Sequence, residues 1–182
     1  MNATATRLTL DEFLHKHGGD YAELIDGIVV PLIPAGTLCG AVGARIICAF
    51  GAFIQDGKHG VACSHDTFVL IQKDPPRVRG ADLCYWPHAS VPEGGVPEGV
   101  IEAPPDLCVE MRSPTYDWPY IFGKVADYLG AGVKAVVVVD PYTNTASVYR
   151  PDAPPQMLVG GDTLTLPDVL PGFAVPVARF FE

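Results

Sequence analysis

The stretch that decides the fold is DLCVEMRSPTYDWPYIFGKVADYLGAGVKAVVVVD, residues 106–140. Residues 106–111 have the length and apolar content of a strand, and 119–131 place apolar side chains on one helical face. Residues 134–140 contain consecutive valines without alternation, which is typical of a strand covered on both faces. A strand, a helix and a strand at this spacing predict a right-handed crossover between parallel neighbours, with Gly132 capping the helix. The fold class is therefore α/β.

The remaining segments predict a mixed β-sheet flanked by helices, with antiparallel hairpins added after the crossover. Thr9 and Glu12 have the spacing of a capping box, and Asp26-Gly27 is a strong signal for a two-residue hairpin turn. The expected elements are a helix from residue 10 to Gly18-Gly19, a hairpin over 21–32, a helix over 38–54, strands near 61–63, 68–71 and 81–86, a loop over 90–106, a hairpin at 141–144 and a turn at 160–161. We expect one domain that covers residues 1–182.

Length and composition favour a cytoplasmic globular protein. The N-terminus lacks a basic segment followed by an apolar stretch, and no uninterrupted apolar run approaches about 18 residues, so we expect neither a secretory signal nor a membrane-spanning helix. The five cysteines are scattered without a CxxC pair, which is typical of reduced, buried thiols rather than a disulfide framework or a zinc site. Cys63 and His65 alone are a weak metal signal.

The net charge of −9 bears on the partners of the chain. Proteins that bind nucleic acid tightly usually present a basic face, because each neutralised phosphate releases counterions. An acidic total still allows a local basic cleft, and carboxylates that hold a metal contribute to the negative count. The charge therefore argues against tight nonspecific binding of DNA.

Two acidic residues lie in segments that otherwise have strand character. Asp82 begins the strand-like ADLCYW, and Glu110 comes late in DLCVEM, near the carboxyl end of a strand, where α/β sheets bind ligands. Burying such a carboxylate costs free energy unless it is paired, hydrogen-bonded or metal-bound. Lys124, on the following helix, lies at the border of the buried face, so its ammonium could reach back over the sheet edge. Two carboxylates and an ammonium suit phosphodiester hydrolysis, because oxygen ligands hold Mg²⁺ and lysine orients the attacking water or offsets developing charge.

Each of these residues also has an ordinary structural interpretation. Asp82 is compatible with a turn at a strand edge, Glu110 with an ion pair to Arg112, and Lys124 with a solvated surface lysine. From spacing alone, the site is a hypothesis.

Seven short stretches of the sequence, in their order and spacing, identify a protein family more specifically than any one of them does alone. They are LTLDEF, YAELIDGIVVPLIPAG, RGADLCYWP, APPDLCVEMRSPT, KVADYLGAGVKAVVVVDP, ASVYRP and LPGFAVPVARFFE. Together they resemble the bacterial putative restriction endonuclease family within the PD-(D/E)XK nuclease superfamily, over nearly the whole chain. The resemblance implies a restriction-endonuclease-like fold, a Mg²⁺ or Mn²⁺ ion held by Asp82 and Glu110, the backbone carbonyl of Met111 as a further ligand, and Lys124 as the catalytic lysine. It also implies that Glu23 can approach the metal.

Two positions depart from the pattern of that family. The superfamily places its lysine two residues after the acid, where this sequence has Arg112; similar proteins supply the lysine from the following helix, at Lys124. Relatives commonly have a histidine after the PAG segment, where this sequence has Cys39. That exchange implies a changed substrate contact or a weakened site.

The leading hypothesis is therefore a Mg²⁺- or Mn²⁺-dependent endonuclease that acts on DNA, as a symmetric homodimer because one site cuts one strand at a time. The alternative is a catalytically silent nuclease fold that serves as a binding or regulatory module, favoured by Cys39 and by the acidic charge. A glycoside hydrolase with paired carboxylates fits less well, because no ordered aromatic platforms accompany both acids.

Side chains that could contact DNA are only weakly indicated by the sequence. The basic candidates are Arg77, Arg79, Arg112, Lys58, His59 and Lys73, and each is more often a solvated surface charge. Tyr116 and Trp118, in the loop before the helix that carries Lys124, could stack on bases, although helix packing or self-association is the simpler expectation.

Overall fold

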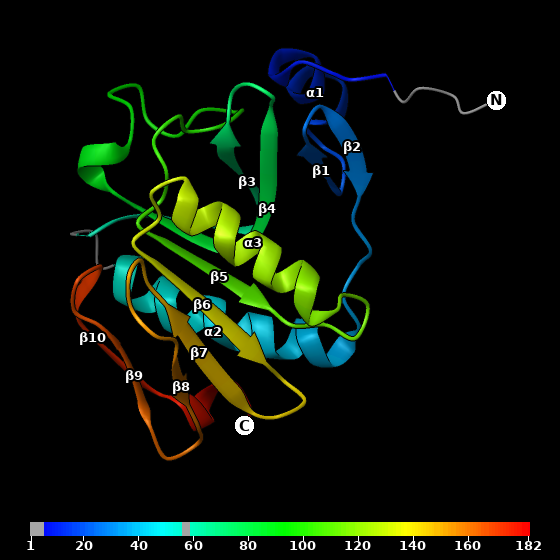
Figure 1. Ribbon diagram of the computed structural model, residues 1–182. Helices are drawn as coiled ribbons and strands as arrows, with labels where there is room; N and C mark the ends of the chain where they lie inside the picture. Colours follow the sequence, from blue (N-terminus) through cyan, green and yellow to red (C-terminus); the bar gives the residue numbers. More distant parts are fainter. Residues whose placement is uncertain (1–5, 56–58) are drawn as a thin grey trace.

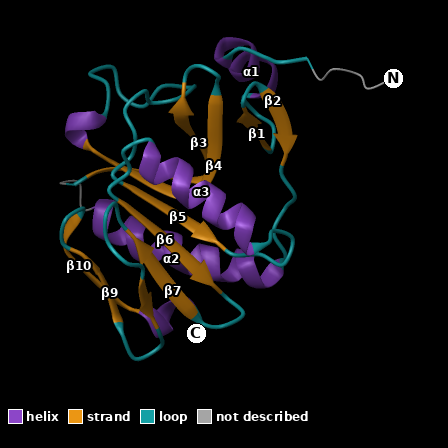
Figure 2. Ribbon diagram, in the orientation of Figure 1, coloured by secondary structure: helices purple, strands orange, loops and turns teal. Residues whose placement is uncertain are grey.

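A computed structural model of this chain describes residues 6–55 and 59–182 (Figure 1). Its main sheet has eight strands in the order β2-β1-β4-β5-β6-β7-β8, with β3 paired to β4. The strands of this sheet are β1 (Ala22–Ile25), β2 (Ile28–Pro31), β3 (Gly60–Gln72), β4 (Arg77–Pro87), β5 (Leu107–Met111), β6 (Ala135–Asp140), β7 (Thr145–Tyr149) and β8 (Gln156–Leu158). The other elements are α1 (Leu10–His17), α2 (Thr37–Gln55), α3 (Trp118–Gly130), β9 (Thr163–Leu166), β10 (Leu170–Pro176) and the short 3-10 helices η1 (His88–Ser90) and η2 (Val177–Phe180) (Figure 2).

The strand–helix–strand unit that the sequence predicts is present. β5 and β6 pair in parallel, with Glu110 opposite Val138, and α3 connects them. α3 begins after Asp117, whose side chain accepts a hydrogen bond from the backbone of the first turn. The helix is capped at Ala131, and Gly132 follows with φ +103°, a left-handed conformation that glycine adopts readily. Gly132 thus stands one position beyond the cap that the sequence assigns to it.

α2 and α3 cover opposite faces of the sheet, with α3 in front of β5–β7 and α2 behind them in Figure 1. The buried side chains of the two helices include Val42, Ile46, Phe50 and Ile54 on α2, and Ile121, Val125 and Tyr128 on α3. Because both faces are covered, β6 is buried along its whole length, which accounts for its unbroken run of valines. The result is a layered α/β/α arrangement.

The N-terminal segment folds as its sequence predicts. α1 has a complete capping box, in which the Thr9 hydroxyl accepts from the N–H of Glu12 and the Glu12 carboxylate accepts from the N–H of Thr9. β1 and β2 form an antiparallel hairpin around Asp26 and Gly27, whose φ values of +51° and +81° suit a type I′ turn. Phe13 joins α1 to this hairpin and to β3 and β4 in a small apolar cluster.

β3 is one long strand, whereas the sequence predicts two short ones near 61–63 and 68–71. A bulge between Ser64 and Thr67 leaves His65 and Asp66 as extra residues, with φ +77° and +53°. Residues 64–67 are consecutively polar, so they interrupt the apolar pattern from which strands are predicted. Pairing with β4 nevertheless resumes on the far side of the bulge.

β4 has β3 along one edge, and β1 and β5 share the other edge. β1 pairs with β4 at Val78, and β5 pairs with it over residues 83–85, while β3 pairs with β4 at both places. Between these two contacts, the edge of β4 over residues 79–82 has no strand neighbour in the described part of the chain. Buried backbone groups in such a gap need other partners. The gap lies at the centre of the candidate site.

The C-terminal segment completes the α2 side of the core. β6 turns into β7 at Asn144, which has φ +54°, and β7 pairs antiparallel with β8. β9 and β10 form a separate antiparallel pair, and their buried side chains join the cluster beneath α2 together with η2. The signal at 141–144 forms the predicted hairpin between β6 and β7, whereas residues 160–161 connect β8 of the main sheet to β9 of the two-stranded one.

α2 is, by length and composition, apolar enough to cross a membrane, which contradicts the expectation that no segment would meet this test. Its glycines and Arg45 break the continuous apolar run that we sought in the sequence. In the protein, 33% of the relevant window is buried, and one face of the helix packs against the sheet. A core helix meets the same criterion, so this feature is weak evidence for a membrane role.

Candidate active site

Asp82, Glu110 and Lys124 come together beside the gap in β4. They arise from β4, β5 and α3, and all three line a pocket of about 350 Å³. The Lys124 ammonium lies 2.6 Å from a carboxylate oxygen of Glu110. Asp82 is anchored by the backbone N–H of Met111, which donates to its carboxylate at 2.6 Å. The residues that the sequence singles out therefore face one cavity.

Lys124 reaches the site because of its position on α3. Tyr120, Lys124 and Tyr128 are spaced by four residues and so lie in one row along the helix. The ammonium donates to the carbonyl oxygen of Gly80 at 2.7 Å, within the stretch of β4 that lacks a strand on this edge. Lys124 is only 4% exposed, so the interpretation as a solvated surface lysine does not hold.

Both oxygens of Glu110 accept hydrogen bonds, one from Lys124 and the other from the Tyr128 hydroxyl, each at 2.6 Å. Burial raises the pKa of Glu110, and the neighbouring ammonium opposes that rise. Burial lowers the pKa of Lys124, but the carboxylates of Glu110, Glu23 and Asp82 outweigh it, so the pKa of Lys124 stands above its ordinary value. Lys124 is therefore a cation at neutral pH, and it cannot accept a proton while it remains one.

Glu23 lies behind Lys124. Its carboxylate accepts hydrogen bonds from Arg79 at 2.7 Å, from the N–H of Gly80 at 3.1 Å and from the Tyr120 hydroxyl at 2.9 Å, and the Lys124 ammonium is 3.6 Å away. The side chain is fully buried. The sequence suggests that Glu23 can approach the metal, but here both of its oxygens already have donors. Its position suits a role in holding β4 and the ammonium.

The structure adds Asp66, which the sequence pattern does not single out. The bulge in β3 lies opposite Asp82, and Asp66 lines the same pocket. Burial raises the pKa of both carboxyl groups, and the charge of Asp66 contributes to the rise at Asp82. The sequence offers one indication of Asp66, because it is an acidic residue within the consecutively polar residues 64–67. That run resembles an ordinary turn.

The oxygen groups of the pocket fit a hard divalent cation. Mg²⁺ is commonly held by one or two carboxylates with several waters retained, and Asp66 and Asp82 line the pocket beside Met111. The raised pKa values of both acids reflect buried negative charge without full compensation, which a cation would supply. Across residues 6–55 and 59–182, no group of three or more acidic, histidine or cysteine side chains is already gathered as a metal site. Asp66 and Asp82 could hold a cation together with water molecules, and Glu110 lines the same pocket.

Comparison with known proteins assigns the chain to a family. A family profile described as "Uma2: Putative restriction endonuclease" matches residues 10–178. The chain belongs to the Uma2 family. Its fold is similar to that in the crystal structure of a putative nuclease belonging to DUF820 from Anabaena variabilis ATCC 29413, with a TM-score of 0.83, 17% sequence identity, and coverage of 96% of this chain and 97% of that chain. A search of curated proteins found no match.

Membership of the Uma2 family makes this chain a nuclease-type hydrolase with nucleic acid as its class of substrate. The fold-class prediction, a restriction-endonuclease-like mixed sheet flanked by helices, is confirmed by the likeness to the DUF820 structure. The family resemblance drawn from the seven stretches is confirmed as well.

Two of the arginines considered as DNA contacts are engaged inside this Uma2 fold. Arg77 pairs with Asp26 at 2.7 Å and with Asp127 at 2.6 Å. Arg79, which is 8% exposed, pairs with Glu23 and Asp127, each at 2.7 Å. These carboxylates occupy the guanidinium groups, so the two arginines brace β4 against α3 and β1 and are poor phosphate ligands.

Arg112 differs from the other two arginines. Its guanidinium lies over the rings of Trp118 and Tyr142, 5.3 and 5.7 Å from their centroids, and 3.6 Å from Asp140. Its Nε is buried and has no hydrogen-bond partner within the described residues. Of the other basic candidates, Lys73 pairs with Glu102, His59 stacks on Phe53, and Lys58 lies outside the described residues.

Cys39, where the resemblance leads us to expect a histidine, lies on α2 and lines the pocket. It is 1% exposed, and its thiol donates to the carbonyl oxygen of Arg112 at 3.6 Å. The aromatic residues near the site pack within the fold, since Tyr116 stacks on Tyr120 with centroids 4.4 Å apart.

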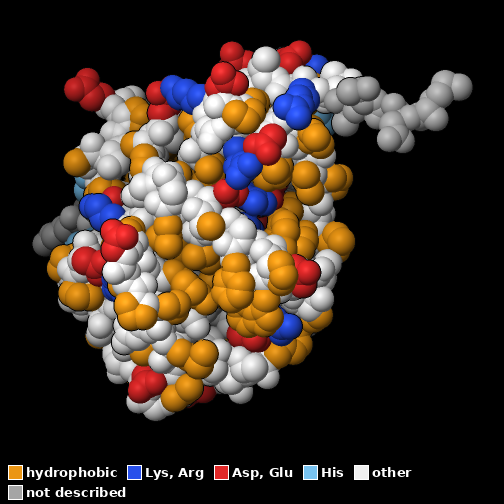
Figure 3. All heavy atoms as spheres, viewed as in Figure 1, with side chains coloured by type: hydrophobic (Ala, Val, Ile, Leu, Met, Phe, Trp, Pro, Cys, Tyr) orange, Lys and Arg blue, Asp and Glu red, His pale blue; other side chains and the backbone are white. Residues whose placement is uncertain are grey.

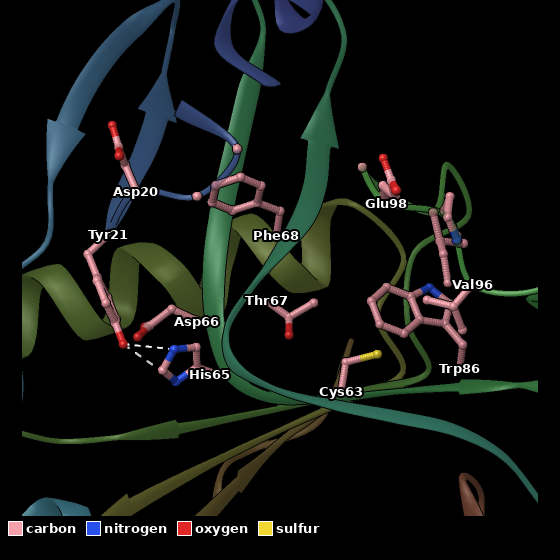
Figure 4. Close-up of a pocket in the computed structure, with 15 residues that line it drawn as sticks. Asp20, Tyr21, Cys63, His65, Asp66, Thr67, Phe68, Trp86, Val96 and Glu98 are labelled. Carbon is pink, nitrogen blue, oxygen red and sulfur yellow. Dashed lines mark hydrogen bonds between the residues drawn. The ribbon is translucent and has the colours of Figure 1, made fainter. Parts of the chain in front are cut away.

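A second pocket of about 310 Å³ adjoins the first (Figure 4). The two pockets share Tyr21, His65 and Asp66. The Tyr21 hydroxyl lies 2.9 Å from Nε2 of His65, and this pair stands between the cavities. Cys63 lies on the wall of the second pocket.

Proposed function

We propose that this chain is a divalent-metal-dependent endonuclease that hydrolyses phosphodiester bonds in DNA. One observation carries the proposal: side chains from three separate elements, Asp82, Glu110 and Lys124, line a single pocket, with the lysine ammonium 2.6 Å from Glu110. Membership of the Uma2 family supports the same reaction class.

The proposed ligands of Mg²⁺ or Mn²⁺ are Asp82, Glu110 and the backbone carbonyl of Met111, to which the structure leads us to add Asp66. When bound, such an ion polarises the phosphate and lowers the pKa of an attacking water. Asp82 is pre-positioned for this role by the N–H of Met111, which leaves its second oxygen available. We do not include Glu23 among the ligands, because it does not line the pocket and its oxygens accept from three other donors.

Lys124 is proposed to stabilise the negative charge that develops on the phosphate. Its raised pKa keeps it protonated, so it acts as an electrostatic group and as a hydrogen-bond donor rather than as a base. The carbonyl of Gly80 and the carboxylate of Glu23 keep the ammonium at the pocket. Tyr128 orients Glu110 through its hydroxyl.

The decisive experiment measures nicking of supercoiled plasmid DNA with Mg²⁺, with Mn²⁺ and with EDTA. Cleavage should require a divalent ion and should disappear in Asp82→Ala and Glu110→Ala. Glu93→Ala, at an exposed position outside the pocket, is the matched control and should retain activity. Equal cleavage by wild type and both pocket variants would reject the proposal.

The alternative function is a catalytically silent binding or regulatory module. The net charge of −9 and the thiol of Cys39 in the pocket wall favour it. Isothermal titration with Mg²⁺ and Mn²⁺ separates the two, because an enzyme should bind the ion at millimolar concentration or better and lose it in Glu110→Ala. Absence of both binding and cleavage would favour the silent module.

We also propose that the active form is a homodimer. One pocket per chain suffices to cut one strand, and two copies related by a two-fold axis would address both strands of a duplex. Sedimentation equilibrium of the full chain, with and without duplex DNA, gives the mass directly. A monomer that makes double-strand breaks would contradict this part of the proposal.

A further inference from the structure

Three of the five cysteines form a row across the sheet. Cys63 on β3 is the direct antiparallel partner of Cys84 on β4, and Cys84 is the direct partner of Cys108 on β5. Residues directly opposite one another in an antiparallel pair point to the same face, so the three thiols line up on the α3 side. The sequence predicts isolated, inert thiols, because these positions are far apart along the chain.

Only one end of the row is accessible. Cys63 is partly exposed and lines the second pocket, where Figure 4 shows its sulfur near Thr67 and Trp86. Cys84 and Cys108 are fully buried. A small reagent that enters this pocket therefore meets Cys63 first, with Cys84 directly behind it.

The two partners differ in reactivity. The thiol of Cys84 donates to the backbone carbonyl oxygen of Cys63 at 3.8 Å. Hydrogen bonding from Cys84 lowers the pKa of Cys63 to about 7, against the opposing effect of burial. Cys84 is fully buried, so a reagent in the second pocket does not meet it first. The thiolate is the nucleophilic form of cysteine, so Cys63 is the reactive member of the pair.

The separation of the pair suits a covalent bond. Direct antiparallel partners have Cα atoms about 4.5–5.5 Å apart, which lies within the range of about 4.4–6.8 Å that disulfides occupy. Accessible, acidic thiols next to a second cysteine are the usual targets of peroxide oxidation.

We propose that Cys63 and Cys84 form a peroxide-reactive thiol pair, in which Cys63 is oxidised first and Cys84 resolves the product to a disulfide. This inference does not depend on the proposed nuclease activity. In the first step, the Cys63 thiolate attacks one oxygen of a hydroperoxide, the O–O bond breaks, and a sulfenic acid and hydroxide (or alkoxide) form. In the second step, the sulfur of Cys84 attacks the sulfenic sulfur, the S–O bond breaks, and the proton of the Cys84 thiol leaves with that oxygen as water. Two thiols are oxidised and one peroxide is reduced.

The proposed disulfide between Cys63 and Cys84 would form close to the candidate active site. Cys63 precedes Ser64, where the bulge that carries Asp66 begins. A covalent link between β3 and β4 at this point clamps one side of the bulge, so oxidation should alter the position of Asp66 in the shared wall of the two pockets. In a reducing compartment the link would be transient.

The experiment treats the full, reduced chain with stoichiometric hydrogen peroxide and maps the product by mass spectrometry without reduction. Trypsin places Cys63 in the peptide 59–73 and both Cys84 and Cys108 in the peptide 80–112. We expect these two peptides to become linked, with fragmentation between the two downstream cysteines assigning the bridge to Cys84. A thiol titration should fall by two of the five groups.

Substitutions test the order of events. Cys63→Ser and Cys84→Ser should each abolish the link, and Cys84→Ser should leave a sulfenic acid on Cys63 that dimedone traps. Cys48→Ser, at an exposed cysteine outside the row, is the matched control and should oxidise as wild type does. Since Cys84 is buried, Cys84→Ala serves if the serine variant does not fold, and the wild-type mapping needs no variant. A bridge that involves Cys108 instead, or oxidation confined to Cys48, would overturn the proposal.

Discussion

Lys124 is held by two buried carboxylates, Glu110 at 2.6 Å and Glu23 at 3.6 Å, and by the carbonyl of Gly80. The ammonium compensates part of the buried negative charge of each of these two carboxylates. Removing one partner of a buried ion pair leaves an uncompensated charge, which costs more than the pair itself contributes. The lysine therefore has a structural role beside the catalytic role that we propose for it.

Lys124→Met should destabilise the protein by about 3–5 kcal/mol, because Glu110 then remains buried without its cation and Glu23 keeps only Arg79. Urea unfolding at pH 7.5, followed by far-UV circular dichroism, measures the loss. The double variant Lys124→Met/Glu110→Gln should recover part of it, since one of the two charges is then removed. A single variant within about 0.5 kcal/mol of wild type would show that the buried network is not formed.

Asp66→Asn should lower metal-dependent cleavage by at least about tenfold while leaving the fold intact, since one proposed oxygen ligand loses its charge. Plasmid nicking at several Mg²⁺ concentrations measures the effect. High Mg²⁺ should restore part of the activity, because weaker metal binding is the cause. Unchanged activity at every Mg²⁺ concentration would remove Asp66 from the site.

The same carboxylates predict a pH dependence. Burial raises the pKa of Asp66 and Asp82 above the ordinary value of 3.8, so the folded state binds these protons more tightly than the unfolded state. Their contribution to stability is present below about pH 4 and is lost as the pH rises through the folded-state pKa values. In EDTA, Asp66→Asn/Asp82→Asn should therefore melt higher than wild type at pH 8, and the difference should vanish near pH 4. Scanning calorimetry checks this, and a variant less stable than wild type at pH 8 would contradict it.

At the level of elements, the site depends on how β3, β4 and α3 meet at Gly80. A Cβ atom there would lie 3.2 Å from the backbone oxygen of Asp66 and 3.3 Å from its Cβ. The residue also offers its N–H to Glu23 and its carbonyl to Lys124. Gly80 thus allows the bulge to approach the open stretch of β4.

Gly80→Ala should displace the bulge, with a loss of about 1–3 kcal/mol from overpacking and a fall in activity on the order of 10²-fold from misplaced ligands. Gly123→Ala is the matched control, because its Cβ would meet only Arg79 Nη2 at 3.9 Å, an ordinary contact. That substitution should raise stability by up to about 1 kcal/mol through helix propensity. Urea unfolding and plasmid nicking on both variants give the comparison, and equal activities would refute the argument.

The elements that depend on local signals could be predicted from the sequence. The capping box at Thr9, the turn at Asp26-Gly27 and the strand–helix–strand unit around Lys124 each follow from short-range chemistry. The bulge in β3 could not, because it exists only through pairing with β4, and a polar run such as 64–67 otherwise indicates a turn. Asp66 was missed for that reason.

The same limit applied to the contacts between elements. Asp82 and Glu110 stand out within their own segments, and the family resemblance adds Lys124. The pairing of Arg79 with Glu23 and the row of three cysteines depend instead on strand order and register. Neither order nor register is written in the composition of any one strand.

For the whole molecule, the distribution of charge matters more than the total of −9. On the face shown in Figure 3, basic side chains lie beside acidic ones, with apolar side chains between them. Arg77 and Arg79 are neutralised by Asp26, Asp127 and Glu23. Few cations therefore remain to replace the counterions of DNA.

Binding of duplex DNA in EDTA should accordingly be weak and only mildly dependent on salt, with a log–log slope shallower than about −3. Fluorescence anisotropy between 50 and 200 mM salt measures the slope. Arg112→Ala should reduce the slope further if its guanidinium contacts phosphate, whereas Lys73→Ala is a control at an exposed ion pair. A slope near −8 would reveal a basic surface that these ion pairs do not suggest.

The pairing of Lys124 with Glu110 bears on whether the fold depends on a bound metal ion. Small domains built around zinc come apart in a chelator, because the ion is the only positive charge that their ligands share. Here an ammonium tethered to α3 already supplies that charge from within the chain. Binding of the proposed ion should therefore exchange hydrogen-bond partners within an already folded pocket rather than drive folding.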